Sequence, residues 1–108
     1  MEPDVSEDIQ LLAEKRAAYC KALGNPARVL ILWILMERET TLKEIALAIG
    51  ASTQSTTRHL NILQFNKLVT SRREKNNIYY YLAENDQTKQ CPVLKNKPQT
   101  VWGETNQI

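Results

Sequence analysis

The chain has 108 residues, a length that fits a single domain. With 43% hydrophobic and 24% charged residues, and only 3 Gly and 4 Pro, its composition excludes a collagen-like or wholly disordered chain. The longest apolar run, residues 29–36, is much shorter than the roughly 20 residues that a membrane-spanning helix needs. The acidic N-terminus lacks an apolar signal core and two cysteines are too few for a disulfide scaffold, so we expect a cytoplasmic protein.

The net charge of +2 is unevenly distributed along the chain. Residues 51–82 carry five Lys or Arg against one Glu, whereas residues 1–50 carry two more acidic than basic residues. Residues 83–108 are balanced. Such an asymmetry indicates a polyanion partner, although a solvated basic face would show the same pattern.

Residues 6–23 are predicted to form an amphipathic helix. Ser6 is suited to cap its N-terminus, and Gly24 is suited to end it. The apolar residues that fall on one stripe at helical spacing are Ile9, Leu12, Ala13, Cys20 and Leu23.

A second helix is predicted to begin at Asn25-Pro26, because Asn is a good cap and Pro is tolerated at the first helical position. The following apolar run, residues 29–36, has no polar face, so its periodicity does not separate helix from strand. The Asn25-Pro26 start favours a helix, and the lack of a polar face predicts that this helix is buried on nearly all sides.

Residues 41–65 are predicted to form a helix-turn-helix. Thr41 and Glu44 fit a capping box, with the Glu44 side chain reaching back to the start of the first short helix. Gly50 supplies the left-handed residue that ends this helix, and Ser52 caps the next one. A tight turn containing Gly between two short helices is typical of DNA-binding proteins.

Residues 68–82 are predicted to form a β-hairpin. β-branched and aromatic residues flank a polar break at residues 74–77, where Asn can adopt a left-handed turn conformation. Helices followed by a hairpin with a basic tip predict a mainly α fold with a β-hairpin wing, the winged helix-turn-helix. We expect residues 1–84 to form this DNA-binding domain, and residues 85–108 to be a partly ordered C-terminal extension without a sustained helical period.

The second helix of the motif, over about residues 52–65, presents two different faces. Leu60 is central to an apolar stripe with Thr56 and Leu63, which we expect to be buried. The opposite face carries side chains that can read base edges in a major groove, since Arg pairs well with guanine and Gln with adenine. With the hairpin cations, which can reach phosphates or the minor groove, the predicted DNA-binding residues are Ser52, Thr53, Gln54, Thr57, Arg58, Asn61, Arg72, Arg73 and Lys75.

About 60 residues of the chain resemble the ArsR-type winged-helix transcriptional repressors. The resemblance lies in residues 22–28, in residues 52–63 with Arg58-His59-Leu60, and in residues 68–82 with their Tyr-rich second strand. It implies a homodimeric repressor that binds an inverted-repeat operator on double-stranded DNA and is released by an inducer. It also implies base contacts by four residues of the second helix: Thr53, Gln54, Thr57 and Arg58.

The metal-sensing members of this family carry a Cys-x-Cys pair where this chain has Thr41 and Lys43, and neither is a soft ligand. The single histidine, His59, lies inside the predicted recognition helix, and we interpret it as a surface or packing residue. We therefore expect no metal site and no cofactor.

The two cysteines are a candidate thiol switch. Cys20 lies on the apolar stripe of the first helix and is expected to be buried there, whereas Cys91 precedes Pro92 in the extension and is expected to be more exposed. The pair either responds to oxidants or soft thiophiles or is simply structural. The expected homodimer pairs through residues 6–23, helped by the extension, where Val93, Leu94, Val101 and Trp102 could pack back on the body.

An enzyme is not expected, because the chain has no Gly-rich phosphate loop and no nucleophile–base pair around its single histidine. The stronger alternative is a winged helix that contacts protein without reading DNA sequence. Replacing Arg58 and Gln54 discriminates between the two, since only a DNA reader depends on them.

Overall fold

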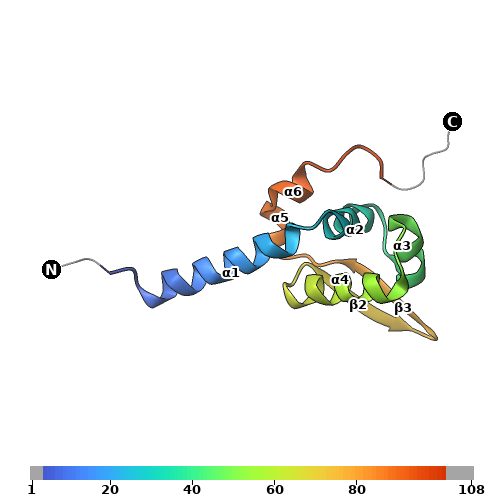
Figure 1. Ribbon diagram of the computed structural model, residues 1–108, viewed down its shortest axis with the longest axis horizontal. Helices are drawn as coiled ribbons and strands as arrows, with labels where there is room; N and C mark the ends of the chain where they lie inside the picture. The colour runs from blue at the N-terminus through green and yellow to red at the C-terminus, as the bar shows by residue number, and fades with distance from the viewer. Residues whose placement is uncertain (1–3, 102–108) are drawn as a thin grey trace.

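The computed structural model describes residues 4–101 and confirms the predicted winged helix-turn-helix (Figure 1). Within this range no helix is long and apolar enough to cross a membrane. In chain order, the elements are α1 (Glu7–Leu23), α2 (Pro26–Glu37), β1 (Thr40–Thr41), α3 (Leu42–Ile49), α4 (Thr53–Phe65), β2 (Val69–Glu74), β3 (Asn77–Leu82), α5 (Asp86–Gln90) and α6 (Pro92–Lys95).

Helix α2 is the centre of the hydrophobic core, as its apolar run predicts. Ile31, Leu32 and Ile34 are at most 1% exposed. Residues from α3, α4, β2 and the C-terminal extension pack around it, so one core holds the whole domain together. Its buried members are Ala22, Ile31, Leu32, Leu35, Ile45, Leu60, Leu63, Leu68, Val69, Cys91 and Leu94.

The sheet has three strands in the order β1-β3-β2, all antiparallel. The hairpin agrees with the prediction, with Val69 opposite Leu82 and Glu74 opposite Asn77. Strand β1 is an addition: Thr40 pairs with Tyr80. Because this strand has only two residues, it has no alternation that the sequence could reveal.

Two local predictions need correction. The Glu44 carboxylate accepts a hydrogen bond from the Thr40 hydroxyl instead of reaching back to Thr41, so only the Thr41 half of the capping box forms. In the hairpin turn the residue with positive φ is Lys75 (58°), not an Asn. Position in the turn, and not the preference of Asn, decides which residue takes that conformation.

The C-terminal extension contains two short helices where no helical period was predicted. Asn85 forms a capping box at the start of α5, and Leu94 of α6 is buried in the core. The indole Nε1 of Trp33 on α2 donates to the Val93 carbonyl at 2.9 Å. These contacts confirm that Val93 and Leu94 pack on the body, whereas Trp102 lies outside the described residues.

Beyond α6, the extension is held on α2 by a half-buried carboxylate. Glu37 Oε2 accepts from Lys97 Nζ at 2.7 Å and from the Val101 backbone N–H at 2.8 Å. Val101 is itself half-buried, as its expected packing requires.

Helix α1 extends from the body as an arm (Figure 1). Ser6 caps it and Gly24 ends it, as predicted. Its apolar stripe, however, is uncovered in the single chain: Ile9 is 55% and Leu12 42% exposed. Only Ala22 of this helix is buried.

Candidate nucleic-acid interface

The turn between α3 and α4 is built by two residues at its ends. Gly50 has φ 70° and ψ 36°, the left-handed conformation that suits glycine, and its N–H bonds to the last turn of α3. Ser52 caps α4 through its side chain, which accepts from Ser55 N–H at 3.0 Å. The tight turn fixes α4 against α3 and aims its N-terminus outward.

The buried and exposed faces of α4 are those predicted. Thr56, Leu60 and Leu63 are completely buried, and the Thr56 hydroxyl is satisfied by the Ser52 carbonyl at 2.8 Å. The predicted base-reading residues lie on the outer side, where they border an open depression. They are Thr53, Gln54, Thr57, Arg58 and Asn61, with Thr57 half-buried and the others exposed.

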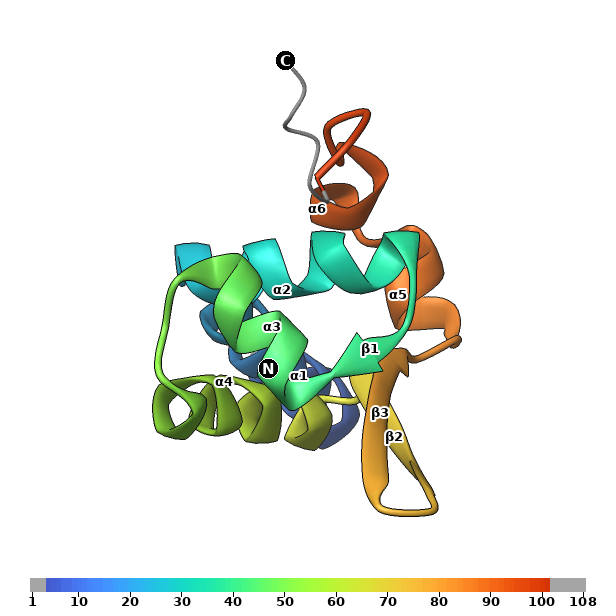
Figure 2. The ribbon, with the colours of Figure 1, turned by 90° about the vertical axis from the view of Figure 1, so that its right-hand side faces the viewer.

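Helix α4 and the hairpin lie on the same side of the molecule. The structure seen from its right-hand end shows both at the lower edge, with α6 at the upper edge (Figure 2). A side-chain hydrogen bond joins the two elements, since Gln64 Nε2 of α4 donates to Ser71 Oγ of β2 at 3.2 Å. Nothing in the local sequence pattern signals this link, because it depends on how the strand lies across the helix.

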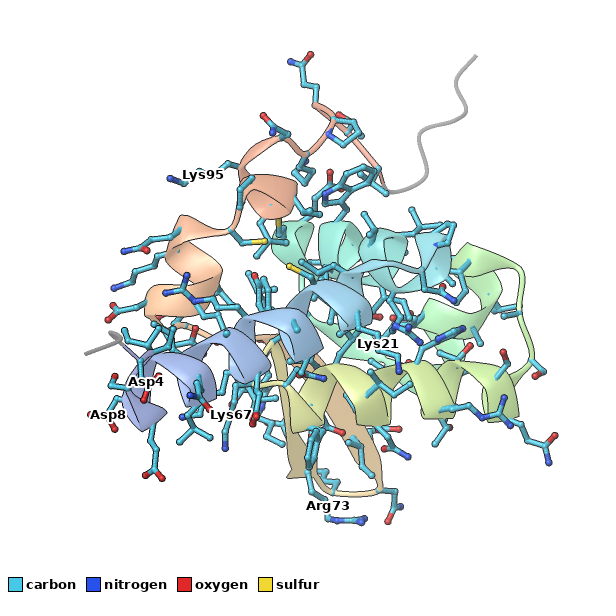
Figure 3. All side chains as sticks on the ribbon, turned by 60° about the vertical axis from the view of Figure 1, so that its left-hand side comes forward. Asp4, Asp8, Lys21, Lys67, Arg73 and Lys95 are labelled. Atoms are coloured by element: carbon cyan, nitrogen blue, oxygen red, sulfur yellow. The ribbon has the colours of Figure 1, made fainter. Side chains whose placement is uncertain are left out.

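The three predicted cations of the hairpin differ in their surroundings. Arg73 projects from the wing (Figure 3), and neither Arg73 nor Lys75 forms an ion pair within residues 4–101. Arg72, in contrast, bonds to Glu39, lies 3.6 Å from Glu74 and stacks on the Tyr79 ring. The hydrogen bond to Glu39 raises the pKa of Arg72, and part of its charge is neutralised by the two carboxylates.

The single histidine is more than a surface residue. His59 is half-buried, and its Nδ1 lies 3.3 Å from Nη1 of Arg28 on α2. Burial, Arg28 and Arg58 together lower the pKa of His59 from 6.5. Within the described residues, no group of three His, Cys, Asp or Glu side chains is placed to hold a metal ion.

The two cysteines lie opposite to their predicted environments. Cys20 is exposed, because α1 leaves the body, and Cys91 is only 2% exposed, because the extension folds back on α2. Both border one surface cavity of about 420 Å³ between α1 and the extension. Tyr19 borders it too, and its pKa is raised by burial and by the neighbouring Cys91 thiol.

Comparison with known proteins gives both relatives and structural neighbours, although no protein-family model matches. The nodulation protein NolR of Rhizobium meliloti is 36% identical over 78 residues, which are 72% of this chain and 61% of NolR. The biofilm growth-associated repressor of Xylella fastidiosa is 30% identical over 72% of this chain and 68% of the repressor.

Among solved structures, one neighbour is the homodimeric winged helix-turn-helix DNA-binding domain of a possible ArsR-family transcriptional regulator from Mycobacterium bovis. It has a TM-score of 0.73 and 31% identity, and the match covers 82% of each chain. The chain spans only 55% to 61% of the length of three curated relatives, NolR among them.

Proposed function

Because the chain belongs to the ArsR family of winged helix-turn-helix transcriptional regulators, we propose that it is a homodimeric repressor that binds an inverted-repeat operator on double-stranded DNA. The observation that carries the proposal is the exposed polar face of α4, which lies on the same side of the molecule as the wing with its cations Arg73 and Lys75. A DNA-binding regulator works where the DNA is, so the proposal includes a cytoplasmic location.

In this proposal α4 enters the major groove, with Gln54, Arg58 and Asn61 toward the base edges. Ser52 and Thr53, at the N-terminus of α4, lie where free backbone N–H groups favour a phosphate. Arg73 and Lys75 of the wing contact the backbone or the adjacent minor groove.

The second copy in the proposed dimer covers α1. Ile9 and Leu12 of its apolar stripe are 55% and 42% exposed, and a partner arm would stabilise the dimer by burying them. The homodimeric neighbour supports this assembly. A dimer also presents two α4 helices, and therefore reads two half-sites about one helical turn apart.

The test is binding to DNA from upstream of the protein's own gene, measured by fluorescence anisotropy against a scrambled fragment. We expect R58A and Q54A each to lose specific affinity by about 1–3 kcal/mol, the range for a strong base contact, with little change on scrambled DNA. K95A, on α6 at the opposite edge, is the control for the lost charge and should bind as the wild type. Equal binding of wild type, R58A and Q54A to both fragments would instead favour a winged helix that contacts protein.

A thiol response is a second candidate property, favoured by the shared cavity of Cys20 and Cys91. The proposal is that a peroxide takes one hydrogen from each thiol, forming one S–S bond and two waters, or that a soft thiophile bridges the two sulfurs. Either reaction ties α1 to the extension. We expect peroxide to weaken operator binding of the wild type but to leave that of C20S unchanged. Because Cys20 is exposed, the C20S substitution should not disturb the fold. A wild type whose operator affinity ignores peroxide and thiophiles would be a constitutive regulator.

A further inference from the structure

The Arg28 guanidinium joins three helices. Arg28 lies in the first turn of α2, where it is half-buried. Its Nε donates to the Ala22 carbonyl of α1 at 2.7 Å, and its Nη2 lies 3.5 Å from the Lys21 carbonyl. Its Nη1 reaches His59 of α4 at 3.3 Å. One side chain therefore connects the α1 arm to the helix that carries the candidate base-reading residues.

The contact with α1 uses groups that the helix leaves free. The last carbonyls of a helix have no partner within it, and cations are favoured at that end. The Lys21 carbonyl also accepts from the Gly24 N–H at 3.1 Å, so the end of α1 is held by both the turn and the guanidinium. The direction in which the arm leaves the body is thereby fixed relative to α2.

The contact with α4 determines the state of His59. A guanidinium has only donors, so Nδ1 of His59 must accept, and the imidazole is neutral with its proton on Nε2. His59 follows Arg58, which is exposed on the outer face, and precedes the fully buried Leu60. His59 can therefore fix the orientation of α4 against α2, although its side chain does not belong to the outer face.

We propose that Arg28 and His59 are positioning residues that fix the angle between the α1 arm and α4, and thereby set the distance between operator half-sites that the dimer accepts. This inference rests on the proposed function, in which α1 pairs the two copies and each α4 reads one half-site. In such a dimer the chain of contacts from one α4 to the other passes through each arm, so a rigid angle demands one spacing.

The same geometry makes the spacing preference dependent on pH. The charged side chains that act on His59 are Arg28 from α2 and Arg58 from its own helix, both of them cations. They, together with burial, keep the imidazole neutral. Protonation at acid pH removes the acceptor at Nδ1 and adds a charge beside Arg28, so the bond between α2 and α4 is lost below the lowered pKa of His59.

The experiment measures affinity for the operator and for versions with one or two base pairs added or removed between the half-sites. The ratio of native to altered spacing is the readout, because general attraction to DNA cancels in it. We expect H59F and R28K to reduce this ratio roughly tenfold, the effect of losing one charge-assisted hydrogen bond, while affinity for an isolated half-site stays unchanged. K95R, an exchange of one cation for the other at the exposed Lys95, serves as the matched surface control for R28K.

H59N separates positioning from folding. The Asn amide oxygen can take the place of Nδ1 as acceptor, and it does not titrate. We expect H59N to keep the spacing preference as the buffer is made acidic, whereas the wild type loses it once His59 protonates, at a pH below the usual range of an imidazole. The inference would be overturned if H59F and R28K had the same affinity ratio as the wild type. It would also be overturned if acid lowered the ratio of H59N as much as that of the wild type. If the wild type binds no inverted-repeat DNA at all, the proposed function itself fails, which is a different result.

Discussion

At the scale of single residues, Lys67 has an unusual backbone. It has φ 64° in the turn between α4 and β2, where its N–H bonds to the Gln64 carbonyl at 3.0 Å and its own carbonyl accepts from Asn85 at 2.9 Å. These bonds hold the left-handed conformation, which costs a residue with a Cβ about 1–2 kcal/mol. The turn is therefore a place where the native residue lowers stability.

We expect K67G to raise the free energy of unfolding by about 0.5–1 kcal/mol, because the relieved strain exceeds the extra chain entropy that glycine has when unfolded. Chemical denaturation measures the change. K67A is the matched control, since it removes the same side chain and keeps the Cβ. If K67A stabilised the protein as much as K67G, the gain would come from the lysine side chain and not from the backbone.

The residue scale also shows where prediction from sequence ends. Ser6, Asn25, Thr41 and Ser52 are confirmed as caps, because a cap depends on the few residues beside it. The environments of the two cysteines were predicted wrongly, because burial is decided by segments far away in the chain. The partner of His59 was missed for the same reason, since Arg28 is 31 positions distant.

At the scale of elements, the wing has fewer free cations than its sequence suggests. Glu39 lies in the connection between α2 and β1 and bonds to Arg72, while Arg73 and Lys75 have no ion-pair partner among the described residues. β1 brings this acid to the wing by pairing with β3. A two-residue strand is invisible to periodicity, and so is the charge pairing that it creates.

This difference predicts unequal effects on DNA binding. R73A and K75A are each expected to weaken binding to all sequences and to lower the salt slope by about 1, the value for one phosphate contact. R72A should lower the salt slope less. E39Q should raise the affinity for DNA, because it removes the carboxylate that bonds to Arg72. Affinity measured across a salt series checks this, with K95A as control. Equal slopes for R72A and R73A would contradict the proposed division of the wing cations.

At the scale of the whole molecule, the chain divides into a packed body and an uncovered arm. The body has one continuous core around α2, and the extension is fastened to it through Trp33, Glu37 and Leu94. The fold of this body could be predicted from caps, periodicity and turn residues. The direction of the arm could not, because the stripe on α1 shows that a helix has an apolar face but not which surface covers it.

The arm leads to the prediction with the widest consequence. Replacing Ile9 and Leu12 together by Glu should abolish the dimer. Burying two such apolar side chains contributes roughly 3–6 kcal/mol to association, and two glutamates would not supply this contribution. Since both side chains are exposed in the single chain, the body should still fold with unchanged helix content. Operator affinity should fall to that of an isolated half-site, because the two α4 helices are then no longer linked.

Sedimentation and anisotropy measured on the same samples test both consequences of this double substitution. A18E on the same helix adds one negative charge on the face opposite the stripe and should remain dimeric with full affinity. A double variant that stays dimeric would show that another surface pairs the copies. A monomer with undiminished operator affinity would show that one winged helix suffices for recognition, and it would remove the reason for expecting an inverted repeat.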